Sequence, residues 1–182
     1  MKATGIVRRI DDLGRVVIPK EIRRTLRLRE GTPLEIFTDR EGEIILKKYS
    51  PMMELKAFAG QYADAMAQST GLMVCITDRD QVIAAAGGAK KDLLQKPISK
   101  QLEHVIQERM TVQAGKDDKA YTPVAAEDIE GIAAQVVAPI ICEGDAIGAV
   151  ILMTREPRVK FGEGEVKLAA TAAGFLGRQM ES

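Results

Sequence analysis

The segments that favour β-structure at the start of the chain are all short. Residues 3–10 and 15–18 are predicted strands around a turn at residues 11–14, and residues 34–38 and 43–48 form a predicted hairpin. Between the two pairs, Pro19 suits the first position of a short helix, which we expect to begin there and continue to residue 26. Because these short elements hide little surface from water, we expect the segment to dimerise in order to form a core.

Charge is unevenly distributed along a chain whose 182 residues include 26 basic and 26 acidic side chains. Residues 1–29 contain 9 basic and 3 acidic side chains, and no acid occurs from residue 22 to residue 29. Clustered cations on a neutral chain predict a local contact with a polyanion. The informative residues are Arg8, Arg15, Arg23 and Arg24, since a guanidinium presents a rigid fork of donors to phosphates and base edges. A solvated basic face is the plainer alternative, and the run without acids favours binding.

Composition narrows the class of protein further. The chain is 46% hydrophobic and 29% charged, which is typical of a globular protein. No apolar run approaches the roughly 18 residues of a membrane span, so we expect a cytoplasmic protein without a membrane partner. Cys75 and Cys142 lie in apolar runs and fit buried reduced thiols. With a single histidine, His104, we expect no metal site.

Ser50 and Pro51 mark a domain boundary, because a proline disfavours helix at the preceding residue and can itself begin one. We expect a linking helix over residues 51–70 and a final helix over residues 163–180. Their apolar residues recur at alternating spacings of 3 and 4, which is typical of paired helices and also of a helix packed on its own domain. Both interpretations stay open. The predicted oligomerisation residues are Leu55, Ala59, Tyr62, Met66, Val166, Ala169, Ala173, Leu176 and Met180.

Between those helices, the pattern changes to short apolar runs with turn residues. It predicts strands over residues 72–77, 82–86, 120–125, 132–139 and 146–153, and a helix over residues 98–109. We therefore expect three parts: residues 1–50, residues 51–70 and residues 71–182.

The motifs Thr4-Gly5-Ile6-Val7-Arg8, Leu13-Gly14-Arg15-Val16-Val17-Ile18-Pro19, Arg23-Arg24-Thr25-Leu26 and Ile44-Ile45-Leu46-Lys47-Lys48-Tyr49 resemble the AbrB family of bacterial transition-state regulators. The resemblance implies a swapped-hairpin β-barrel dimer that binds double-stranded DNA. The family's DNA-contacting arginines correspond to Arg8, Arg15, Arg23 and Arg24. Supporting phosphate contacts are expected from Arg9, Lys20, Arg27 and Arg29.

Taken whole, the chain resembles the AbrB-family sporulation regulators whose C-terminal half is GAF-like. This implies an α+β protein of two domains, with a GAF-like antiparallel sheet and flanking helices after the swapped-hairpin dimer. It also implies a nucleoid-associated activator and repressor of sporulation genes, assembled as a homodimer or homotetramer. The Asn-Lys-Phe-Asp-Glu motif of cyclic-nucleotide GAF domains does not occur, so a ligand of this domain stays unknown.

Two other functions compete with this interpretation. Antitoxins share the N-terminal fold and use their C-terminal segment to bind a toxin, but such segments are usually extended, whereas residues 71–182 read as folded. A GAF-like redox enzyme could use Cys75 and Cys142, although nothing cationic adjoins either thiol to lower its pKa. We therefore expect a regulator and no enzyme.

Overall fold

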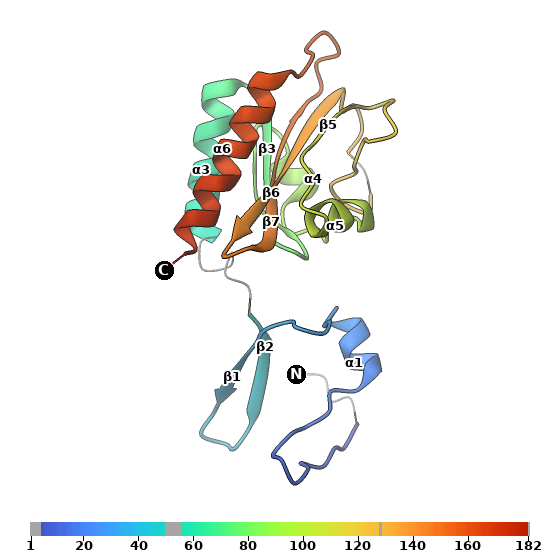
Figure 1. The fold of residues 1–182 in the computed structure, drawn as a ribbon, viewed down its shortest axis with the longest axis vertical. Helices are drawn as coiled ribbons and strands as arrows, with labels where there is room; N and C mark the ends of the chain where they lie inside the picture. The colour runs from blue at the N-terminus through green and yellow to red at the C-terminus, as the bar shows by residue number, and fades with distance from the viewer. Residues whose placement is uncertain (1–4, 50–55, 128, 182) are drawn as a thin grey trace. The chain divides into compact units, whose positions relative to one another are not determined.

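The computed structural model describes residues 5–49, 56–127 and 129–181, in two compact units, Met1–Tyr49 and Ser50–Ser182. The first unit contains the helix α1 (Lys20–Thr25) and an antiparallel hairpin of β1 (Leu34–Thr38) and β2 (Ile44–Lys48), as Figure 1 shows. Asp39 shapes the hairpin loop, since its carboxylate accepts hydrogen bonds from the amides of Glu41 (3.0 Å) and Glu43 (2.9 Å). This hairpin was predicted from the sequence, and its existence is confirmed.

The other two strands predicted for this unit are not observed among its described residues. Residues 5–10 and 15–18 are extended chain on either side of a turn, which Asp11 closes by donating its amide hydrogen to the carbonyl of Arg15 (3.0 Å). A strand is defined by a ladder of hydrogen bonds, and these segments lack one within the chain. Pro19 is also one position earlier than predicted, because its ψ of 146° makes it the N-cap of α1.

Apolar side chains in the first unit face solvent. Val7 is 88% exposed, Val17 70% and Ile36 67%. Within residues 5–49, only Pro19 is buried. Among its described residues, 5–49, the unit therefore has no hydrophobic core of its own as a single chain.

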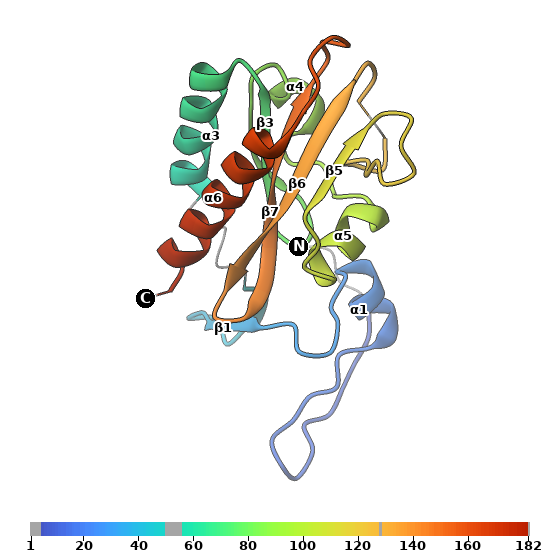
Figure 2. The same cartoon turned by 45° about the horizontal axis from the view of Figure 1, so that its top comes forward.

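The second unit is built on a five-stranded antiparallel sheet in the order β4-β3-β7-β6-β5. Its helices α3 and α6 lie side by side on one face of the sheet, and α4 and α5 lie on the other (Figures 1 and 2). The strands are β3 (Met73–Thr77), β4 (Val82–Ala86), β5 (Val112–Gly115), β6 (Ala134–Cys142) and β7 (Asp145–Thr154), and the helices are α3 (Lys56–Thr70), α4 (Lys90–Leu93), α5 (Lys100–Gln107) and α6 (Glu163–Gln179).

One predicted strand of this unit is wrong. Residues 120–125 form no strand, and within them only Ala125 makes an isolated bridge, to Ile98. Pro123 interrupts this run and cannot donate to a ladder, so the edge strand β5 is formed earlier, at Val112–Gly115. The segment between β5 and β6, residues 116–133, has no helix or strand among its described residues. The short helix α4 was not predicted.

Each face of the sheet carries a separate apolar core. Alternate residues of β7 divide between them, with Val150 and Leu152 under α3 and α6, and Ile151 and Met153 under α4 and α5. The C-terminal unit thus buries both faces of its sheet without a partner chain.

Candidate DNA-binding face

Asp11 organises the turn that presents the first arginines. Its Oδ1 accepts hydrogen bonds from the amides of Leu13 (3.0 Å) and Arg15 (2.8 Å), and its Oδ2 pairs with Nε of Arg15 at 2.8 Å. The hydrogen bonds from Arg15, backbone first, lower the pKa of Asp11 below its ordinary value. Arg15 is thereby fixed at the end of the turn, while most of its side chain stays in solvent.

The short helix α1 presents the central pair of arginines. Arg23 and Arg24 lie in its last turn and are exposed, whereas Ile22 of the same helix is half-buried. The helix ends in a Schellman motif, in which the amide of Leu28 donates to the carbonyl of Arg23 (2.7 Å) and the amide of Arg27 to that of Arg24 (3.3 Å). This motif fixes the direction in which the chain leaves the helix and leaves both guanidinium groups exposed.

Arg27 occupies an unusual position in that motif. Its φ of 50° lies in the left-handed region, where glycine is the common residue. Lys48 of β2 donates from Nζ to the carbonyl oxygen of Arg27 (3.4 Å), which ties the helix end to the hairpin. Sequence analysis missed Lys48 as a supporting residue, and nothing local in the sequence shows that it contacts a helix 21 residues earlier.

All eight predicted DNA-contacting and phosphate-contacting residues belong to the first unit and are exposed. Arg8 and Arg9 lie on the extended segment before the turn, Lys20 begins α1, and Arg29 follows the helix end. Among the described residues, no carboxylate pairs with Arg8, Arg23 or Arg24. These three guanidinium groups are therefore available to an anion.

The predicted oligomerisation residues differ in how deeply the structure buries them. Five of them are buried against the sheet of their own chain and belong to its core: Ala59, Met66, Ala169, Ala173 and Leu176. The 3-and-4 spacing of these five side chains thus agrees with packing on a sheet of their own chain, which is one of the two interpretations that the sequence left open. Tyr62, Val166 and Met180 are partly exposed, and Leu55 lies outside the described residues.

An aromatic cluster joins the outer sides of α3 and α6. The ring of Tyr62 lies 5.4 Å from that of Phe175 and 6.1 Å from that of Phe58, measured between centroids. Phe175 is 41% exposed. Burial in this cluster raises the pKa of Tyr62. We name Phe58, Tyr62 and Phe175 the aromatic patch.

The two cysteines lie on opposite faces of the sheet. Cys75 is fully buried in the core under α4 and α5, whereas Cys142 packs against the core under α3 and α6. Burial raises the pKa of the Cys75 thiol, and partial burial together with Glu143, Glu181 and Asp145 raises that of Cys142. Neither thiol is activated, and the sheet separates them, so the arrangement does not suit a redox pair.

Neither a metal-binding cluster nor a membrane-spanning helix occurs in the described part of the chain. No group of three His, Cys, Asp or Glu side chains there is arranged to hold a metal ion. None of the helices in residues 5–49, 56–127 and 129–181 combines the length and the apolar character needed to span a bilayer.

Comparison with known proteins identifies the family. A family model described as stage V sporulation protein T C-terminal, transcription factor, matches residues 54–181. Stage V sporulation protein T of Bacillus subtilis (strain 168) is 57% identical over 181 residues, which are 100% of this chain and 99% of that relative. The chain belongs to the stage V sporulation protein T family. The expectation of a sporulation transcription factor is thereby confirmed.

This member of the stage V sporulation protein T family combines two domain types, since a second family model matches its N-terminal part. The model of the bacterial antitoxin MazE matches residues 7–53, and the transition state regulatory protein AbrB of B. subtilis (strain 168) is 56% identical over 64 residues, 35% of this chain and 65% of AbrB. The antitoxin likeness is confined to the N-terminal part, because the family's transcription factor model accounts for the remainder.

The fold of the C-terminal unit agrees with this assignment. The crystal structure of a GAF domain region from Geobacter sulfurreducens superposes with a TM-score of 0.54 at 16% identity, covering 70% of this chain and 93% of that one. The stage V sporulation protein T family member described here is therefore an α+β protein of two domains, with an AbrB-type hairpin domain and a GAF-like domain.

Proposed function

We propose that this transcription factor binds double-stranded DNA as a homodimer through Arg8, Arg15, Arg23 and Arg24, with Arg9, Lys20, Arg27 and Arg29 on flanking phosphates. The observation that carries the proposal is the exposure of all eight cations on a unit of the AbrB type. A two-fold dimer presents two copies of the four central guanidinium groups, eight in all, to a pseudo-palindromic site. We further propose that it acts in the cytoplasm as both activator and repressor of sporulation genes.

Dimerisation is supported by the missing core of the first unit. Val7, Val17 and Ile36 remain in water in a single chain, and hydrophobic burial is the main favourable term in folding. The extended segments 5–10 and 15–18 have unused backbone hydrogen-bonding groups that a second chain can pair. A swapped hairpin satisfies both needs at once.

The test is fluorescence anisotropy on a host promoter fragment across a salt series. The parent is compared with Arg23→Ala/Arg24→Ala and with Arg40→Ala, a control in the exposed β1–β2 loop of the same unit. If all eight central guanidinium groups contact phosphates, the slope of log affinity against log salt approaches about −7. We expect the double variant to lose affinity and flatten the slope, with Arg40→Ala near the parent. Equal losses in both variants would contradict the assignment.

We also propose that the aromatic patch joins dimers into a tetramer. Its rings span α3 and α6 on their outer sides, and aromatic side chains concentrate the energy of protein interfaces. Phe175→Asp is expected to convert tetramer to dimer in sedimentation velocity, because a carboxylate in an apolar contact is strongly unfavourable. Ala170→Asp, at an exposed position of α6, serves as the matched control. A tetramer that survives Phe175→Asp would refute the patch as the interface.

A further inference from the structure

The carboxylate of Asp11 is held in place by the backbone of its own turn. Its Oδ1 accepts hydrogen bonds from the amides of Leu13 (3.0 Å) and Arg15 (2.8 Å), and the amide of Gly14 donates to the carbonyl oxygen of Asp11 (3.0 Å). Rotation of the carboxylate would break both hydrogen bonds to Oδ1. Oδ2 is therefore a fixed acceptor, and it lies 2.8 Å from Nε of Arg15.

The contact with Asp11 uses one donor of the Arg15 guanidinium and leaves the others free. A guanidinium carries five N–H donors, one on Nε and two on each Nη. Asp11 occupies the Nε donor, while the Arg15 side chain remains 68% exposed. Because Nε is held, the orientation of the planar group is restricted, and its two Nη groups remain available as a preorganised pair of donors.

Charge distinguishes Arg15 from the other three arginines of the proposed face. Among the described residues, no carboxylate pairs with Arg8, Arg23 or Arg24. A phosphate that approached Arg15 would also approach the carboxylate of Asp11, and like charges repel. A base edge has acceptors without a net charge and avoids this repulsion. In the major groove, guanine offers the acceptors O6 and N7, which match two donors of one arginine.

We propose that Asp11 positions Arg15 to read a guanine in the major groove, whereas Arg8, Arg23 and Arg24 contact phosphates. The inference rests on the DNA binding proposed above and names the residue that selects the sequence. Phosphate contacts place a protein on the duplex, and base contacts carry the sequence information. Asp11 is a positioning residue, because it acts through Arg15. A two-fold dimer then has two guanine-reading positions, one in each chain.

The test compares two forms of one host promoter fragment by fluorescence anisotropy with the full-length protein. One form contains guanine, and the other contains 7-deazaguanine, which lacks the N7 acceptor and keeps Watson–Crick pairing. We call the ratio of the two affinities the guanine preference and expect about tenfold or more for the parent. Equal binding of both forms would overturn this inference alone. Absence of binding to either form at low salt would overturn the proposed function as well.

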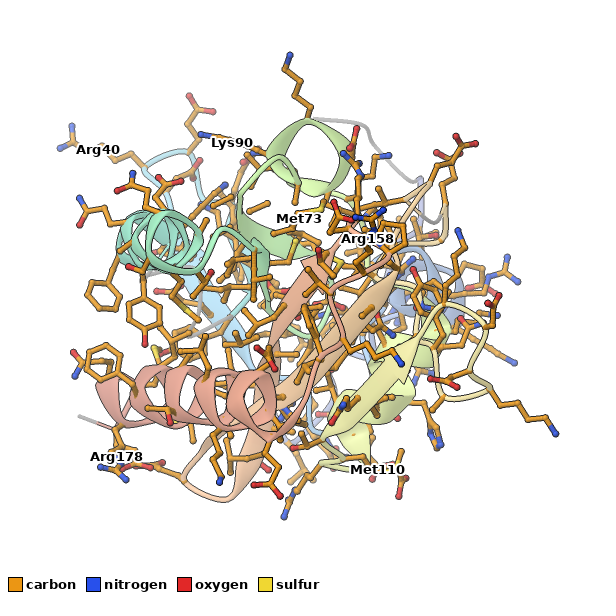
Figure 3. All side chains as sticks on the ribbon, turned by 90° about the horizontal axis from the view of Figure 1, so that it is seen from above. Arg40, Met73, Lys90, Met110, Arg158 and Arg178 are labelled. Carbon is orange, nitrogen blue, oxygen red and sulfur yellow. The ribbon has the colours of Figure 1, made fainter. Side chains whose placement is uncertain are left out.

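Arginine variants assign the guanine preference to one residue. Arg15→Ala should bind the two forms equally. Arg23→Ala should keep the preference and flatten the salt slope by about 2, since each dimer loses two phosphate contacts. Arg40 of the β1–β2 loop extends away from the ribbon into solvent, as Figure 3 shows, so Arg40→Ala should change neither quantity. A preference that survives Arg15→Ala, or that is lost in Arg23→Ala, would contradict the assignment.

Two substitutions test Asp11 itself. Asp11→Asn keeps the Oδ1 acceptor and replaces Oδ2 by an amide nitrogen that cannot accept from Nε, so the guanine preference should fall to about 1. Asp12→Asn removes the same charge from the same exposed turn and should keep the preference. The variant Asp11→Asn/Arg15→Ala should have the same preference as Arg15→Ala, because Asp11 acts through Arg15.

An undiminished guanine preference in Asp11→Asn would overturn the positioning role, and so would an equal loss in Asp12→Asn. If Asp11→Asn fails to fold, Asp11→Ser takes its place. Serine also supplies an acceptor to a turn of this kind and lacks the second oxygen that contacts Arg15, so the same loss of preference is expected.

Discussion

At position 11, one carboxylate accepts three hydrogen bonds, two from backbone amides and one from the guanidinium of Arg15. The turn signal of residues 11–14 was readable in the sequence, because Asp and Gly have known turn preferences. The ion pair between Asp11 and Arg15 could not be predicted from the sequence, since it depends on the direction that the chain takes after the turn.

The lowered pKa of Asp11 gives a prediction about acid. A carboxyl whose pKa is lower in the folded state stabilises that state above its ordinary value of 3.8, and this contribution is lost as the pH falls through the lowered value. We expect the amide resonances of Leu13 and Arg15 to shift together on acidification below about pH 4. In Asp11→Asn, which keeps the Oδ1 acceptor and removes the charge, that titration should be absent. If the titration persists in Asp11→Asn, it arises from another ionisable group.

Arg27 offers a prediction that separates stability from binding. Its left-handed φ costs a non-glycine residue about 1 kcal/mol, so Arg27→Gly should raise the free energy of unfolding by about that amount in urea titrations. If Arg27 binds phosphate, the same variant should bind DNA more weakly, with a salt slope shallower by about 1 for each phosphate that the variant no longer neutralises. Arg29→Gly, outside the left-handed position, should not be stabilised. Tighter DNA binding by Arg27→Gly would disprove a phosphate-binding role for this side chain.

Among the elements, α6 shows what a correct helix prediction leaves open about the partner of its apolar face. The helix was expected over residues 163–180 and is observed at Glu163–Gln179. Ala169, Ala173 and Leu176 follow the spacing of a coiled coil, yet they pack on β6 and β7. Periodicity gives the apolar side of a helix and does not reveal whether a sheet or another helix covers it. The prediction of a strand over residues 120–125 was wrong for a similar reason, because burial alone does not distinguish a loop that covers a core from a strand.

Two glycines of α6 give a matched pair of substitutions. A Cβ at Gly177 would collide with the carbonyl oxygen of Ile141, whereas a Cβ at Gly174 meets nothing within 4 Å. We expect Gly177→Ala to lower the free energy of unfolding by about 1–3 kcal/mol, because α6 must move away from the backbone of Ile141 near the end of β6. Gly174→Ala should raise it by about 0.5–1 kcal/mol through helix propensity.

Urea unfolding of both variants, at one protein concentration, measures the difference. Stabilisation by Gly177→Ala would show that α6 does not approach Ile141 as closely as described. Destabilisation by Gly174→Ala would instead place that exposed position in an interface between chains.

At the scale of the whole molecule, the two units differ in how they hide apolar surface. The second unit has two cores within one chain, and the first has none among its described residues. Sequence reasoning anticipated this difference from the shortness of the elements in residues 3–48. The burial of Gln135 without a hydrogen-bond partner among the described residues could not be predicted, because a lone glutamine in an apolar strand does not indicate what its side chain contacts.

This difference predicts unequal responses to dilution. Protection of amides in β1 and β2 from hydrogen exchange should fall when the protein is diluted from about 50 μM to well below its dimer dissociation constant, since the first unit needs a second chain. Protection of the central strands β3 and β7 should change far less. Mass spectrometry of peptic fragments reports both regions in one sample. Concentration-independent protection of β1 and β2 would mean that the first unit folds alone.

The central strand β7 serves as a common wall between two apolar compartments. Its residues alternate between them, so Leu152 and Met153 are adjacent in the chain but belong to different cores. A shift of the β7 backbone by a fraction of an ångström therefore changes the packing of both compartments at the same instant, because interiors are too dense to absorb it on one side. A change in what fills one compartment reaches the helices over the other through the thickness of a single strand.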